Sequence, residues 1–341
     1  SDPWGSFHPV IGWQSFGGLF MLVGWGLWMA RSHLRDVFRK AIVGDDSVDD
    51  QEELVSYRLA VWVLIGAGTY LMFWLKQAGM GWGPLLVFWF ATLVLYLGVA
   101  RIIVESGLVF LRGPITAQAF TWHLFGFLGM GPYSAAALGL TWTFFCDAKT
   151  SGMTALAHIP RLGAAMNRES RRRLVPAVML ASVVGASAVI GFTLYYGYEV
   201  TGSYNFGVVS FNGSNDSAIG SWRLTASRIQ AATMDTSWDR IGFLGIGAAV
   251  VAFLFYVRYL FPSFPIHPMG FTISAASSIR NISLSVFIIW AAKGLILRLG
   301  GLDLYRRLTP FFLGMLVGYL VGIALGVVVD FIWFPGSGHD I

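Results

Sequence analysis

Six apolar stretches, each about long enough to cross a lipid bilayer, constrain this chain more than any other feature of its sequence. A membrane-spanning helix needs roughly 20 predominantly apolar residues. The stretches are Pro9–Ala30, Leu59–Ala78, Pro84–Val104, Leu174–Val200, Ile241–Phe261 and Leu308–Phe334. Only 12% of the residues are charged, whereas soluble domains carry roughly 25%. We therefore predict an all-α fold, a polytopic integral membrane helix bundle.

Two further apolar regions are interrupted. Ile115–Asp147 contains the sequence GMGP at residues 129–132, and Ser263–Arg298 opens with SFPIHPMG. Proline in a helix interior removes a backbone hydrogen bond and clashes with the preceding turn. Each region is therefore predicted to be either a re-entrant hairpin of two half-helices or a pair of short spans. Together with the six full spans this gives about 8–10 membrane helices.

The distribution of lysine and arginine predicts how the chain crosses the membrane. Arg31–Arg58, Asp147–Arg173 and Arg298–Arg307 are rich in these residues, which marks them as cytoplasmic. Gly79–Gly83 and Thr201–Arg240 then lie outside. We expect a multi-pass protein of the bacterial inner membrane with both termini extracytoplasmic.

The order of the segments repeats weakly along the chain. Residues 59–147 contain two spans followed by an interrupted region, and residues 174–298 contain the same sequence of elements. This predicts a weak parallel repeat within a single transmembrane domain of residues 1–341, in which residues 201–240 form an extracytoplasmic loop.

Charged residues near the inner ends of two spans are the first candidates for function. Arg101 and Glu105 are four residues apart and therefore share one helical face. Arg258 occupies the corresponding place in the second half of the repeat. A charge at the bilayer centre costs about 2.5–3.5 kcal/mol on insertion scales, so we expect Arg101 and Glu105 to pair and to face the protein. The pair either closes a helix at the membrane interface or handles ions or solute in a pathway.

The second interrupted region supplies further candidates. Three prolines precede a run of small polar residues, and His267, Ser277 and Asn281 are the members of this region that we consider for a substrate or ion pathway. Non-helical backbone at membrane depth is tolerated where protein covers it or where it lines an aqueous cavity. The region is therefore either part of a binding site near the midplane or a buried packing kink.

The last span carries glycine at every fourth position. The residues are Gly314, Gly318, Gly322 and Gly326. Small residues at this spacing allow helix backbones to approach closely in lipid. We predict a glycine zipper, with the Gly318 Cα about 6–7 Å from a neighbouring helix, compared with the usual 8–10 Å.

Motifs of soluble enzymes are missing from the sequence. It contains no phosphate-binding loop, dinucleotide fingerprint, HExxH sequence or serine-nucleophile elbow. None of the six histidines lies at metal-ligand spacing from another. We therefore expect no enzyme activity, cofactor or metal. The formal net charge of +5 resides in short loops, which reflects membrane orientation and predicts no nucleic-acid partner.

Several segments, among them HPMGF, ARIIVESGL and WAAKGLILRLGGLDLYRRLTPFFLGMLVG, resemble a family of large, uncharacterised bacterial multi-span proteins. That family is remotely similar to oligopeptide transporters. The resemblance covers most of the chain and implies that it corresponds to the C-terminal half of a protein about twice as long. It transfers no catalytic role to any residue.

Two functions fit these observations. The first is a membrane transporter, or half of one, that moves a small polar solute by ion coupling. A peptide-like molecule is one candidate for this solute. The alternative is a non-transporting structural subunit of a larger membrane complex. In either case the expected partners are membrane lipids and an N-terminal half or other membrane subunits.

Overall fold

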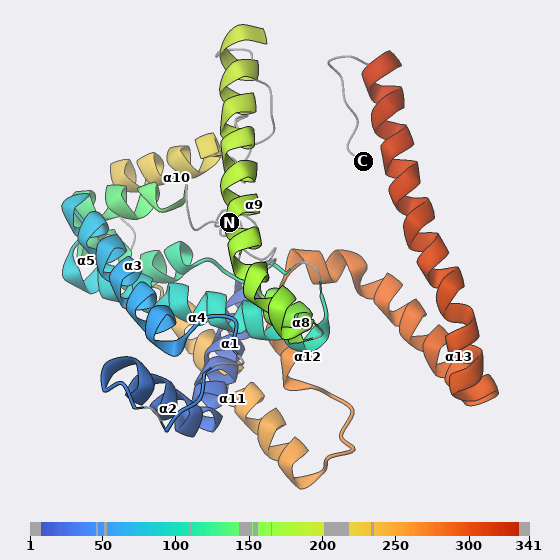
Figure 1. The fold of residues 1–341 in the computed structure, drawn as a ribbon. Helices are drawn as coiled ribbons and strands as arrows, with labels where there is room; N and C mark the ends of the chain where they lie inside the picture. The colour runs from blue at the N-terminus through green and yellow to red at the C-terminus, as the bar shows by residue number, and fades with distance from the viewer. Residues whose placement is uncertain are drawn as a thin grey trace. The chain divides into compact units, whose positions relative to one another are not determined.

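The computed structural model of the chain is built from helices (Figure 1). It describes residues 8–45, 47–50, 53–108, 111–142, 152, 156–164, 166–200, 218–232 and 235–333. Within these ranges there are helices and no strand, which confirms the predicted all-α class. The helices are α1 (Pro9–Met29), α2 (Arg31–Ile42), α3 (Tyr57–Gln77), α4 (Trp82–Ser106), α5 (Ala117–Leu140), α8 (Ile159–Ala164), α9 (Arg168–Tyr195), the π-helical turn η1 (Tyr196–Val200), α10 (Ala218–Ala231), α11 (Trp238–Leu260), α12 (Pro268–Ile273) and α13 (Ser277–Trp333).

Six helices among the described residues are long and apolar enough to cross a membrane. They are Pro9–Met29, Tyr57–Gln77, Trp82–Ser106, Arg173–Glu199, Trp238–Leu260 and Ile279–Asp330. The first five match predicted spans to within a few residues, and the sixth contains all but the last few residues of the final predicted span. The chain is thus a multi-pass membrane protein by helix length and composition.

Local sequence sets several helix ends. Ser56, Thr116 and Asn167 cap α3, α5 and α9, each accepting a hydrogen bond from a backbone N–H of the first turn. Gly107 ends α4 with a φ of 74°, a left-handed conformation that glycine adopts without a steric penalty. The helix α11 ends at Leu260, two residues before the first of the three prolines.

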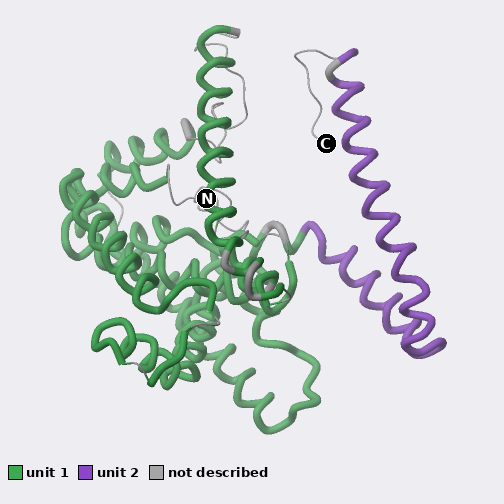
Figure 2. Tube along the Cα trace, in the orientation of Figure 1, with its two compact units in different colours: residues 1–280 green, residues 281–341 purple. Residues whose placement is uncertain are grey.

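The chain divides into two compact units, residues 1–280 and 281–341 (Figure 2). In the first unit, α1 packs against α4, α11 and α12. The core contains large side chains of α1 and α4, including Phe16, Leu19, Phe88 and Ile102. The helix α1 therefore contacts more of the other helices of this unit than its own length alone would require, and half of its apolar window is buried.

The closest helix contact in the first unit joins α1 to α11. A Cβ placed on Gly17 would lie 2.7 Å from the carbonyl carbon of Leu244, and one on Gly247 would lie 2.7 Å from Gln14 Cα. Only glycine leaves room for the two backbones at this separation. Small residues therefore do bring two spans together in this chain.

The glycine face of the last span behaves differently. A Cβ on Gly314, Gly318 or Gly322 would meet no heavy atom within 4 Å. Within the second unit, no described residue covers this face, so the close contact predicted for Gly318 is not formed between the two arms of α13. Packing of the face, Gly326 included, against another molecule stays a prediction.

The second unit consists of one helix, α13, that reverses at a glycine. Gly301 has a φ of 62° and a ψ of −159°, a combination that is essentially restricted to glycine. The arm before it, residues 277–300, is about 36 Å long at 1.5 Å per residue, enough to cross a hydrocarbon core of about 30 Å. The second interrupted region is thus the short helix α12 followed by a helix of full spanning length.

The predicted extracytoplasmic loop 201–240 is partly helical. Residues 201–217 lie outside the described ranges, but α10 follows them and packs on α5. Ser221 and Thr225 of α10 are buried, and Thr225 contacts the position where Gly139 lacks a side chain. This part of the loop belongs to the packed structure.

Candidate functional site: a re-entrant hairpin and an ion pair

The helix α5 is broken at two glycines. Gly126 has φ 64° and ψ −179°, and Gly131 has φ 73° and ψ 167°, so residues 117–125 and 132–140 form separate half-helices. Each half is about 13 Å long at 1.5 Å per residue. Neither crosses a hydrocarbon core of about 30 Å. Of the two alternatives for this region, the structure therefore has the re-entrant hairpin.

The tip of the hairpin lies beside the connection between α3 and α4. The Gly81 N–H donates a hydrogen bond to Ser134 Oγ, at 3.0 Å. A Cβ on Gly83 would lie 3.4 Å from the Phe125 ring, and one on Gly79 would lie 3.4 Å from Tyr133 Cβ. The tip therefore reaches the level at which α4 begins.

The segment that leads into the hairpin lies near the middle of α4. A Cβ on Gly113 would be 3.4 Å from Leu95 Cγ and closer still to one of its methyl groups. Leu95 is about 20 Å along α4 from Trp82. Because α4 is long enough to cross the membrane, the chain returns from Gly107 at its end to mid-depth before α5 begins.

Gln118 closes the base. Its Nε2 donates a hydrogen bond to the Thr141 carbonyl, at 3.1 Å, which joins the start of the first half-helix to the end of the second. Gln118 is 1% exposed, and its Oε1 has no hydrogen-bond partner among the described residues. Rotating the amide would direct Oε1 at another carbonyl oxygen. An unpaired buried polar atom costs about 1–3 kcal/mol, so the base contains an unsatisfied acceptor.

The segment before α11 pairs with carbonyls that the break in α5 leaves free. The Ser237 N–H donates to the His123 carbonyl at 2.9 Å, and Thr236 Oγ1 donates to the Leu124 carbonyl at 3.1 Å. The last carbonyls of a helix lack partners within the helix. At membrane depth such groups must be satisfied by protein or water, and residues 236–237 do this here.

The side chain of His123 is held by the same segment. It is 3% exposed, and Arg240 Nη1 lies 2.7 Å from its Nε2. Arginine can only donate, so Nε2 accepts and the imidazole is neutral with its proton on Nδ1. Nδ1–H then donates to Ser237 Oγ, at 3.0 Å. The sequence did not predict this cluster, because its partners lie more than a hundred positions apart; a histidine within an interrupted apolar region was the only available signal.

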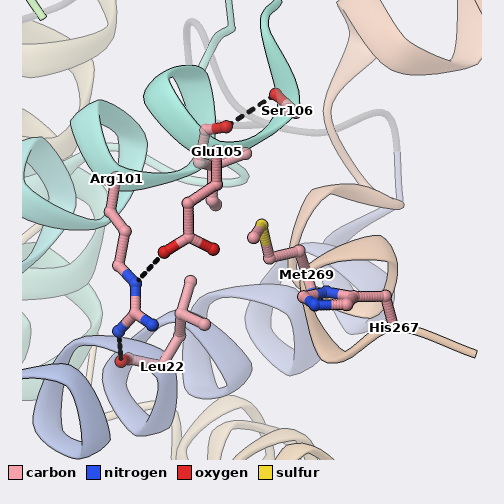
Figure 3. Close-up of polar contacts among 7 residues, drawn as sticks. Leu22, Arg101, Glu105, Ser106, His267 and Met269 are labelled. Carbon is pink, nitrogen blue, oxygen red and sulfur yellow. Dashed lines mark hydrogen bonds and ion pairs between the residues drawn. The ribbon is translucent and has the colours of Figure 1, made fainter. Parts of the chain in front are cut away.

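The predicted ion pair is present at the other end of α4 (Figure 3). Arg101 Nε lies 2.7 Å from Glu105 Oε1, and Arg101 Nη1 donates to the Leu22 carbonyl of α1, at 3.0 Å. The guanidinium lies over Gly26, whose missing side chain leaves space for it. The side chains of Arg101 and Glu105 are 33% and 39% exposed. The predicted ion pair and its contact with the protein are confirmed. Both side chains remain partly accessible to solvent.

The structure does not gather the other pathway candidates around this pair. The side chain of Arg258 is half-buried and makes no hydrogen bond or ion pair with another described residue. His267 caps α12 by accepting a hydrogen bond from the Met269 N–H, at 3.2 Å. The side chain of Ser277 lies outside what the structure describes, and Asn281 is exposed in the second unit. Their role in a pathway stays a prediction.

Comparison with known proteins shows the family. The chain belongs to the family described as "Family of unknown function (DUF6785)", whose model matches residues 2–337. The resemblance to an uncharacterised family is thereby confirmed. No curated protein and no solved structure matches the chain, so the comparisons show no similarity to oligopeptide transporters.

Proposed function

We propose that this member of the DUF6785 family is a membrane transporter, or half of one, for a small polar solute such as a peptide, coupled to an ion. The observation that carries the proposal is the re-entrant hairpin α5, which follows a segment packed at the depth of Leu95 and whose base contains the unpaired oxygen of Gln118. Transporters use discontinuous helices near the midplane to bind their substrates. The break in α5 is stabilised by the connection between α3 and α4 and by residues 236–237. Two helices that served only for packing would not require such a break.

The ion pair at the end of α4 supports ion coupling. Glu105 is partly exposed and bound to Arg101, and α4 leads through Gly107 directly into the base of the hairpin. A change in the protonation or ion occupancy of the Glu105 carboxylate alters the Arg101 contact to α1.

The test is whether the base of the hairpin opens. In a variant lacking the native cysteine, Thr141→Cys places a thiol at the base, where Thr141 is 0% exposed. A transporter must expose this position, so a membrane-impermeant thiol reagent should label it from at least one side of the membrane. An ion gradient should change the labelling rate.

The matched control is Ala91→Cys, because Ala91 is also 0% exposed but lies in the packed core of α4. We expect no labelling there. Equal labelling rates at positions 141 and 91, under every ion gradient applied, are incompatible with a transport pathway through the hairpin.

One observation favours the alternative, a structural subunit of a larger complex. The apolar windows of α9 and of Ile279–Asp330 are 0% buried in this chain. Spans left uncovered in this way suit contacts with an N-terminal half or with other membrane subunits, in addition to lipid. Under this alternative the native mass of the complex exceeds that of the chain, and Thr141→Cys stays unlabelled from both sides.

A further inference from the structure

A cavity of about 380 Å³ lies between the two arms of α13, close to the reversal at Gly301. Its size is within the range of about 300–1,000 Å³ that is usual for ligand pockets. Most of its wall is apolar, formed by Ile289, Ile296, Phe312 and Met315. All of the lining residues belong to the two arms of α13 in the second unit, and the cavity is open on one side.

One cation faces this cavity. Lys293 Nζ lies 5.4 Å from the centre of the Tyr305 ring, a cation–π contact that fixes the ammonium against the wall. Thr309 also lines the cavity and donates its hydroxyl hydrogen to the Tyr305 carbonyl, at 3.0 Å, which leaves its oxygen free to accept. Lys293 makes no ion pair with any described residue. The cavity thus combines an unneutralised ammonium with apolar walls.

The depth of Lys293 indicates what neutralises it. Lys293 is about 12 Å along the helix axis from Gly301. The headgroup layer on each side of a bilayer is about 5–8 Å thick. With the reversal at the membrane surface, the Lys293 backbone lies just inside the hydrocarbon, and its flexible stem brings the ammonium to the level of the lipid phosphates.

The residues around the chain reversal at Gly301 are mostly basic. Arg298, Arg306 and Arg307 are exposed around Gly301, with Asp303 as the acidic residue among them. Clusters of lysine and arginine at this depth attract anionic lipids, and basic pockets between membrane helices bind their headgroups. The charge near the cavity therefore complements an anion on the membrane side.

We propose that the cavity binds an anionic phospholipid, with the phosphate at Lys293 and an acyl chain along the four apolar side chains. Free phosphate would use the ammonium but not the apolar walls, so the lipid is the ligand that matches both. This site is independent of the proposed transport function and of the hairpin in the first unit.

The test uses the full chain in detergent and measures lipid retention by native mass spectrometry, with phosphatidylglycerol or phosphatidylcholine carrying identical acyl chains. We expect preferential retention of phosphatidylglycerol. Lys293→Gln should weaken that retention by more than about fivefold, the loss expected for removal of any one basic residue near the surface, because Lys293 also lines the cavity. Arg306→Gln removes one charge from the reversal outside the cavity and should have a smaller effect.

Three outcomes would overturn the proposal. They are unchanged retention in Lys293→Gln, equal losses in Lys293→Gln and Arg306→Gln, and full competition by inorganic phosphate. The melting temperature of each variant in phosphatidylcholine controls for folding. A second variant, Met315→Trp, fills the cavity without altering charge and should also reduce retention; retention equal to that of the unmodified chain would likewise contradict the assignment.

Discussion

The contact between α1 and α11 allows a sharp test of the fold, through the substitution Gly247→Ala. The added Cβ would lie 2.7 Å from Gln14 Cα and would overlap the Gln14 carbonyl. The clash is with backbone atoms, so no side-chain rotation relieves it. The two helices must therefore separate by about 1 Å at this point to restore van der Waals contact, and a gap of 0.5–1 Å forfeits a quarter to a half of the dispersion energy of the atoms involved.

The size of the effect follows from comparison with Gly245→Ala. Gly245 is on the same helix, and its Cβ would meet no heavy atom within 4 Å. Both substitutions gain the same helix propensity of about 0.5–1 kcal/mol, so the difference between them isolates the clash. Overpacking in a close-packed interior costs about 1–3 kcal/mol. At about 2 °C per kcal/mol for a large chain, Gly247→Ala should melt about 2–6 °C below Gly245→Ala.

The measurement is thermal unfolding in one detergent, followed by tryptophan fluorescence, which reports on the fourteen tryptophans of the chain. Gly17→Ala, which places a Cβ against the Leu244 backbone from the opposite helix, should reproduce the loss. If Gly247→Ala and Gly245→Ala melt at the same temperature, α1 and α11 do not approach through these glycines, and the reasoning about the first unit fails.

Three further outcomes are expected. Gly126→Ala should destabilise the fold by about 1–3 kcal/mol, because φ 64° with ψ −179° is essentially restricted to glycine. Gly129→Ala is the control: its Cβ would lie an ordinary 3.5 Å from the nearest atom, so its melting temperature should equal that of the unmodified chain. Glu105→Gln should abolish uptake of a transported solute at unchanged thermal stability; in a structural subunit it should lower assembly or stability and alter no flux. In a background without the native cysteine, an impermeant reagent applied outside intact cells should label Ser227→Cys and not Ser170→Cys, both exposed serines, if the positive-inside orientation holds.

The sequence predicted the elements whose signal is local. Length and apolarity identified the spans, and the three prolines beginning at Pro262 correctly placed a helix end before them. The spacing of Arg101 and Glu105 predicted their ion pair, because residues four apart on a helix are neighbours whatever the helix packs against. Their contact with the Leu22 carbonyl is a tertiary feature, and no pattern in the sequence indicated it.

The sequence could not predict which small residues are covered. Regular four-residue spacing drew attention to Gly314, Gly318 and Gly322, yet the close approach in this chain occurs at Gly17 and Gly247. Regularly spaced glycines indicate that one helix can be approached closely, but they do not identify the helix that approaches it. The same limit applies to long-range polar pairs, which depend on the tertiary arrangement of segments far apart in sequence.

The spans differ in burial, and the windows of α3 and α11, each 17% buried, lie between the extremes. The apolar windows of α1 and α4 are 50% and 56% buried, whereas those of α9 and Ile279–Asp330 are 0% buried. Buried polar side chains gather on and around the well-packed spans, with Gln118, Thr121 and His123 in the hairpin itself. A buried polar group is tolerated where its surroundings are fixed, since each lost partner costs about 1–3 kcal/mol. The well-packed part of the first unit is therefore where polar groups can be held in a fixed arrangement.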